Sequence, residues 1–147
     1  DSVVYEYNEN DATEYTPDIG DHLGQWTNEL KADQYITHLV SSGPKSYAFI
    51  TNDGMRTTKL KGFTLNHEVS KLLNFDSICK LVLFWADPDA HPLEADEKPS
   101  VEVTFGKIRR NKHEFKLFSR EEVKKFRVTY SKRCLIPNTY DTLPFGF

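Results

Sequence analysis

The tripeptide Asn52-Asp53-Gly54 constrains the fold of this 147-residue chain more than any other short segment. Such Asx-Gly steps favour the tight turns of β-hairpins, because Asn, Asp and Gly tolerate left-handed backbone conformations. Runs rich in β-branched and aromatic residues flank it over residues 47–51 and 55–61, and another covers 35–41. The sequence therefore predicts an antiparallel meander, whose other turn is Ser42-Gly43-Pro44.

Helix signals precede and follow this meander. Residues 2–7 read as a buried strand, after which Thr16-Pro17-Asp18 offers an N-cap, a proline at the first helical position and an early acid. Apolar residues then recur at helical spacing, which predicts a helix over 16–30: Ile19, Leu23, Trp26 and Leu30. Asn66 is expected to cap a short helix through Leu73, and Asp76 a second helix over 77–85.

The last third of the chain reads as mixed structure. Residues 87–100 hold three of the seven prolines, which predicts a loop. Strands are expected over 101–105 and 114–118, and the capping-box pattern at 119–122 predicts a helix to Phe126. A strand over 127–135 and a turn-rich tail complete a chain of predicted class α+β.

Charge divides the chain into two unequal parts. Residues 1–100 carry 8 basic and 17 acidic side chains, a net −9, whereas residues 101–147 carry 11 and 5, a net +6. The basic part could follow a phosphate backbone, or it could be an ordinary solvated face. Its basic residues include Lys107, Arg109, Arg110 and Lys112, followed by Lys124, Lys125, Arg127, Lys132 and Arg133.

Several short motifs resemble family B DNA polymerases of the protein-primed branch. Asp1-Ser2-Val3-Val4-Tyr5 is similar to the second half of the Y-x-D-T-D-S-V motif in that family's palm. Gly43-Pro44-Lys45-Ser46-Tyr47 resembles its K-x-Y element, and residues 61–66 match the K-G-F-T-L-N segment that follows. Residues 132–137 and 141–147 look like the C-terminus of these polymerases in Polinton/Maverick transposons and related viruses. The resemblance spans nearly the whole chain and is weakest over 87–125.

The resemblance implies part of a DNA-templated DNA polymerase, a nucleotidyltransferase that adds dNTPs to a primer 3′-hydroxyl with two Mg²⁺ ions. Residues 1–63 would be the C-terminal part of the palm, an antiparallel sheet with one helix, and residues 64–147 a mixed α/β thumb-like module. Asp1 would be a catalytic and metal-binding carboxylate. The other catalytic groups would lie upstream in a longer chain, so the isolated chain is expected to be inactive and to hold Mg²⁺ weakly.

The same resemblance implies how the chain would meet its partners. Lys45 and Tyr47 stand two apart on an expected strand, which would place both on one sheet face for contact with the primer. Lys107, Arg109, Arg110 and Lys112 would contact duplex DNA. The expected partners are a DNA primer-template, dNTPs, the rest of the polymerase chain and a terminal protein primer.

A second hypothesis is a non-catalytic module that binds nucleic acid or protein and derives from a transposon remnant. Both hypotheses place the chain inside a cell and away from membranes. The longest apolar run, Leu81 to Ala86, is far shorter than the roughly 20 residues that cross a bilayer, and no signal sequence opens the chain.

Overall fold

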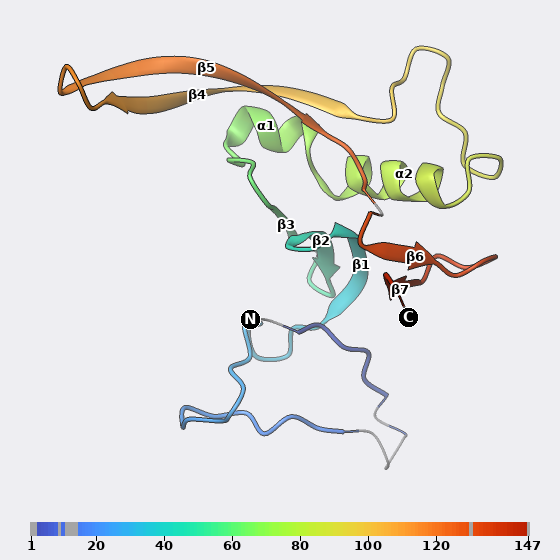
Figure 1. The fold of residues 1–147 in the computed structure, drawn as a ribbon. Coiled ribbons are helices and arrows are strands. Elements are labelled where there is room, and N and C mark those ends of the chain that lie inside the picture. Colours follow the sequence, from blue (N-terminus) through green and yellow to red (C-terminus); the bar gives the residue numbers. More distant parts are fainter. Residues whose placement is uncertain (1–2, 9, 11–14, 130, 147) are drawn as a thin grey trace. The chain divides into compact units, whose positions relative to one another are not determined.

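The computed structural model describes residues 3–8, 10, 15–129 and 131–146. The chain divides into two compact units, residues 1–34 and 35–147. All helices and named strands that the described residues form belong to the second unit (Figure 1). The strand predicted over residues 2–7 is wrong for its described part, which has no regular structure.

The helix predicted over residues 16–30 is also wrong. Ile19 instead forms an isolated bridge with Trp26, whose backbone N–H donates to the Asp18 carbonyl at 2.8 Å. Gly24 lies within this reversal at φ 96°, a left-handed conformation that suits glycine and interrupts a helix. Leu23 and Trp26, which were spaced for a buried helix face, stay exposed. Helical periodicity without a surface to bury it is insufficient to form the helix.

The second unit begins with the predicted meander. Its strands are β1 (Ile36–Gly43), β2 (Ser46–Thr51) and β3 (Arg56–Leu60), paired antiparallel in the order β1-β2-β3. At the β2–β3 turn, Gly54 has φ 81° and donates to the Thr51 carbonyl at 2.9 Å. The turn prediction is therefore confirmed, with glycine at a position that needs its conformational freedom.

Two helices follow β3. They are α1 (His67–Leu72) and α2 (Phe75–Ala86). Asn66 caps α1 as predicted, its side chain accepting from Val69 N at 2.9 Å. The cap of α2 is Asn74, which forms a reciprocal capping box with Ser77, so the prediction of Asp76 as cap is wrong. Asp76 instead pairs with Arg56 of β3 at 2.6 Å.

Two long strands then form a ribbon. They are β4 (Val101–Asn111) and β5 (Lys116–Phe126), paired antiparallel along their entire length from Val101↔Phe126 to Asn111↔Lys116. The helix predicted from the capping box at 119–122 is therefore wrong. Those residues lie within β5, where pairing with β4 satisfies their backbone groups and overrides the local helix signal.

Short strands β6 (Arg133–Leu135) and β7 (Thr142–Pro144) pair near the C-terminus. Of the described residues in the strand predicted over 127–135, only those of β6 form a strand. One hydrophobic core joins the meander, both helices and the start of the ribbon: Val40, Ala48, Leu60, Val69, Leu73, Ile78, Leu81, Val103, Phe105, Phe126 and Val128. The ribbon and α1 both contribute side chains to this core, and α1 contacts β4.

The class is α+β with antiparallel sheets, as predicted. The assignment of residues 1–63 to a palm and 64–147 to a thumb stays a prediction. No helix among the described residues combines the length and the apolar character needed to cross a bilayer.

Candidate nucleic-acid interface

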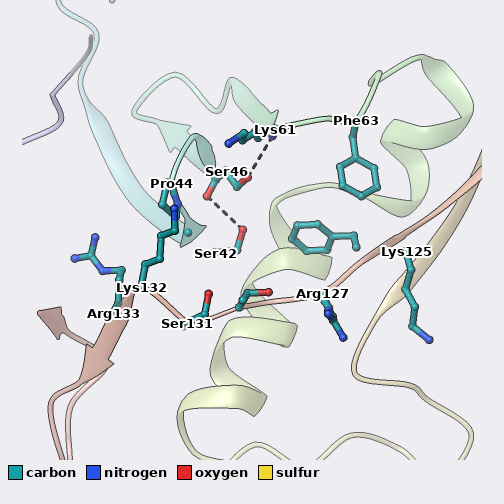
Figure 2. A pocket seen from close by; sticks show the side chains of 13 residues that line it. Ser42, Pro44, Ser46, Lys61, Phe63, Lys125, Arg127, Ser131, Lys132 and Arg133 are labelled. Atoms are coloured by element: carbon teal, nitrogen blue, oxygen red, sulfur yellow. Dashed lines mark hydrogen bonds between the residues drawn. The ribbon is translucent and has the colours of Figure 1, made fainter. Parts of the chain in front are cut away.

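A pocket of about 380 Å³ lies within the second unit, and Figure 2 shows the side chains around it. We call it the basic pocket, because its charged lining consists of five cationic residues: Lys61, Lys125, Arg127, Lys132 and Arg133. Four hydroxyl side chains also line it: Ser42, Ser46, Thr129 and Ser131. None of the described residues in the lining is acidic. This composition suits an anion with several oxygen acceptors, such as a phosphate group.

The β1–β2 turn builds one wall of the basic pocket. Ser42, 6% exposed, donates from its hydroxyl to the Ser46 carbonyl at 3.3 Å, and the Ser46 hydroxyl accepts from Lys61 N at 3.2 Å (Figure 2). Gly43 has φ 139°, and a Cβ there would lie 3.8 Å from the Thr129 carbonyl. The turn therefore approaches the segment after β5 closely, and it brings two hydroxyls together with cations distant in sequence.

The cations of the basic pocket differ in their partners. Lys125 pairs with Glu102 at 3.4 Å, and Arg133 donates to the Thr142 carbonyl at 2.9 Å. Among the described residues, Lys61, Arg127 and Lys132 have no carboxylate within ion-pair distance. Their charges repel one another, and a bound anion would relieve that repulsion.

Lys45 and Tyr47 do not share a sheet face, so that premise of the sequence analysis is wrong. Lys45 occupies the turn before β2 at φ 59°, and its side chain is exposed. Tyr47 lies inside β2, where its ring stacks on Phe49 with centroids 6.3 Å apart, and Lys59 approaches the Tyr47 ring at 5.9 Å. Pro44 and Lys45 together form the reversal, which removes Lys45 from the alternation of the strand.

The predicted ribbon cations are divided between its two faces. Lys107 and Arg109 lie 3.3 and 3.9 Å from Glu122, on the face that continues from the core. The Arg110 guanidinium instead lies 6.0 Å from the Phe115 ring centroid on the opposite face. Lys112 is exposed in the turn at the end of the ribbon. The four residues therefore cannot form one continuous contact surface.

Glu122 is the one acid in this part of the ribbon that meets several cations. The contact with Lys107 lowers the pKa of the Glu122 carboxyl, and the charges of Lys124 and Arg109 act in the same direction against a partial burial that raises it. Lys124 also donates to the Gly62 carbonyl at 2.6 Å and lies 5.0 Å from the Phe105 ring centroid. The cluster fixes Lys107 and Lys124 where the ribbon leaves the core.

Asp1, the predicted catalytic and metal-binding residue, lies outside the described residues. Within the part of the chain that the structure describes, no group of three or more His, Cys, Asp or Glu side chains could hold a metal ion. The expectation that Asp1 helps to hold two Mg²⁺ ions therefore stays a prediction.

The chain matches no family model, no curated protein and no solved structure. Sequence reasoning placed Lys125, Arg127, Lys132 and Arg133 in a basic segment, but it missed their convergence with the hydroxyls of the β1–β2 turn. The only signal for that convergence was Gly43, whose left-handed backbone permits the turn.

Proposed function

We propose that this chain is a palm and thumb portion of a family B DNA-templated DNA polymerase and that its basic pocket binds the sugar-phosphate backbone of the primer-template. The observation that carries the proposal is an acid-free lining in which Lys61, Arg127 and Lys132 have no ion-pair partner among the described residues. Lys45 resembles the lysine of the family's K-x-Y element. It lies in the β1–β2 turn, and its neighbours Pro44 and Ser46 line the basic pocket.

The chemistry of the pocket fits a positioning role. Cationic groups neutralise phosphate charge without reading base identity, and hydroxyls such as that of Ser46 can donate to phosphate oxygens. In the intact enzyme, the primer 3′-oxygen would attack the α-phosphorus of a dNTP, forming a phosphodiester bond and releasing pyrophosphate. The metal ions that assist this step would be held by carboxylates of the longer chain. The role of this chain would be to hold the DNA strand in a fixed position through its phosphates.

The second candidate is a nucleic-acid-binding module without catalysis. It is favoured by the lining of the basic pocket, because cations and hydroxyls can bind a nucleic-acid backbone without any catalytic group. Both candidates predict the same binding, so binding is tested first and catalysis second.

The binding test compares two double variants in a salt series with a labelled DNA duplex. Arg127→Ala with Lys132→Ala removes two pocket cations, while Lys71→Ala with Lys80→Ala removes two exposed cations that pair with Glu68 and Glu97. We expect the slope of log affinity against log salt to fall by about 0.9 for each lost phosphate contact in the pocket variant. The control should keep the wild-type slope, and equal slopes in both variants would contradict the proposal.

The catalytic test uses a full-length polymerase that contains this chain. Lys45→Ala should reduce primer extension while duplex binding is retained, because Lys45 would act at the primer terminus. A full-length protein that binds duplex DNA but never extends a primer would support the binding module. Templated, Mg²⁺-dependent extension by the isolated chain would contradict the expectation that its catalytic groups are incomplete.

A further inference from the structure

The half of the ribbon beyond the core presents a surface that the basic pocket does not include. We call residues 106–121 the outer ribbon. Its strands pair Lys107 with Arg120, Arg109 with Phe118, and Asn111 with Lys116. Directly paired residues lie on one side of a two-stranded ribbon, and alternate residues along a strand share that side. Five of these side chains therefore form one surface, which we call the cationic face: Lys107, Arg109, Lys116, Phe118 and Arg120.

Phe118 lies at the centre of the cationic face and is 45% exposed. Arg109 is its direct cross-strand neighbour, and Lys116 and Arg120 precede and follow it on the same side of β5. Each of the last two lies about 7 Å from Phe118 along the strand, from the rise of an extended chain. An aromatic ring surrounded by four cationic side chains would be a poor site for an apolar protein segment, because covering the ring would also remove those charges from water.

The charge of the cationic face is compensated unevenly. Lys107 lies 3.3 Å from Glu122, whereas Arg109 lies 3.9 Å from the same carboxylate. Among the described residues, Lys116 and Arg120 have no carboxylate within ion-pair distance. The uncompensated positive charge therefore lies on β5, on both sides of Phe118, where a polyanion with planar groups could contact both the charges and the aromatic ring.

We propose that the cationic face binds a nucleic-acid strand with unpaired bases, one of which stacks on Phe118 while Arg109, Lys116 and Arg120 contact the flanking phosphates. Stacking on an aromatic side chain needs an accessible base face, and base faces are covered by neighbouring bases in a duplex. This inference rests on the proposed function and extends it, since the basic pocket would hold backbone and the outer ribbon would hold an unpaired stretch of the same substrate.

A lipid surface is the strongest competing partner for an exposed ribbon with cations and apolar groups. Ile108 and Leu117, both 72% exposed, lie on the side opposite Phe118. The end of the ribbon that would enter a membrane first, however, is polar over Asn111 to Glu114. Phe115, 78% exposed, is the apolar residue of this turn, and it adjoins those polar side chains and the Arg110 guanidinium. Because the end of the ribbon is mostly polar and the other apolar groups lie on a flank, the observations favour nucleic acid.

The test exploits two neighbouring residues on opposite sides of β5. Fluorescence anisotropy with a labelled oligothymidylate strand, and with a blunt duplex of equal length, should compare Phe118→Ala with Leu117→Ala. We expect Phe118→Ala to weaken single-strand binding by between about fivefold and about 150-fold, the range for one lost stacked base. Leu117→Ala should leave it unchanged. Duplex binding should change little in both variants, because the basic pocket is intact.

Two further variants separate stacking from simple apolar contact. Phe118→Trp should retain single-strand affinity, while Phe118→Leu should lose it as Phe118→Ala does. Equal losses in Phe118→Ala and Leu117→Ala, or wild-type affinity of Phe118→Leu, would overturn the inference. Binding to vesicles of phosphatidylcholine and phosphatidylserine that Leu117→Ala abolishes would assign the outer ribbon to a lipid surface instead.

The inference and the proposed function can fail separately. If the wild-type chain binds duplex DNA through the basic pocket but Phe118→Ala keeps full single-strand affinity, only the inference fails. If the pocket variant alters no nucleic-acid binding while Phe118→Ala weakens single-strand binding, the proposed role of the pocket fails and the inference stands. If the chain binds neither probe, both fail.

Discussion

The inner and outer halves of the β4–β5 ribbon share one hydrogen-bonded ladder but differ in what covers them. On the inner half, Val103, Phe105 and Phe126 are 2%, 7% and 5% exposed and join the core. On the same side of the outer half, Phe118 is 45% exposed. An isolated pair of strands is marginally stable in water, so burial of the inner half stabilises the ribbon. The sequence of the outer half is then free to serve binding.

The largest effect that tests this comparison concerns stability. Phe126→Ala should lower the free energy of unfolding by about 3–5 kcal/mol, because the ring is buried and packs edge-on against Phe63 with centroids 5.8 Å apart. Phe118→Ala, the same chemical change on the outer half, should alter it by less than about 0.5 kcal/mol. Urea unfolding followed by circular dichroism would measure both, and similar losses would show that the outer half is also part of the core.

The elements that could be predicted from sequence are those whose causes are local. The turn at Asn52-Asp53-Gly54 needs a left-handed glycine, and Asn66 caps α1 with its own side chain. The pairing of β5 with β4 has a distant cause. Residues 119–122 carry a helix signal, yet their backbone groups pair with residues 105–108. A prediction from a short stretch of sequence around residues 119–122 does not include β4, the strand with which they pair.

The candidate site shows the same limit. A cationic segment near the C-terminus could be seen in the sequence, but its distribution over a pocket and two ribbon faces could not. Lys45 and Tyr47 satisfied the alternation rule for a strand, and the rule failed because the strand begins one residue after Lys45. The hydroxyls of Ser42 and Ser46 gave no signal, because their contribution depends on a segment more than 80 residues away, at Thr129.

The next effect concerns binding and sharpens the comparison between the two faces of the outer ribbon. Arg109→Ala should lower the salt slope of single-strand binding by about 0.7, the contribution of one phosphate contact. Arg110→Ala should leave the slope unchanged, because its guanidinium lies over Phe115 on the opposite face. Anisotropy titrations at several salt concentrations give both slopes. If Arg110→Ala lowered the salt slope more than Arg109→Ala, the binding surface would lie on the face of Arg110, opposite Phe118, and the inference would be contradicted.

The smallest effect lies at the boundary between the two halves, where Glu122 meets Lys107 and Arg109. Because the contact with Lys107 holds the pKa of Glu122 below its ordinary value of 4.5, the folded state binds this proton less readily than the unfolded state. The carboxylate therefore adds stability above the unfolded pKa, and this contribution is lost as the pH falls through the folded pKa. Glu122→Gln removes the charge and should abolish that dependence.

Urea unfolding of the wild-type chain and Glu122→Gln from about pH 7 to about pH 3 would measure the difference. We expect it to be constant at neutral pH and to shrink below the ordinary pKa of a glutamate. Glu121→Gln is the matched control, since Glu121 neighbours Glu122 in β5 but its side chain points to the opposite face. A pH-independent difference for Glu122→Gln would mean that Lys107 and Arg109 do not stabilise the carboxylate. Those two cations of β4 would then be as free for phosphate as Lys116 and Arg120 of β5, and the contrast between the two strands of the cationic face would disappear.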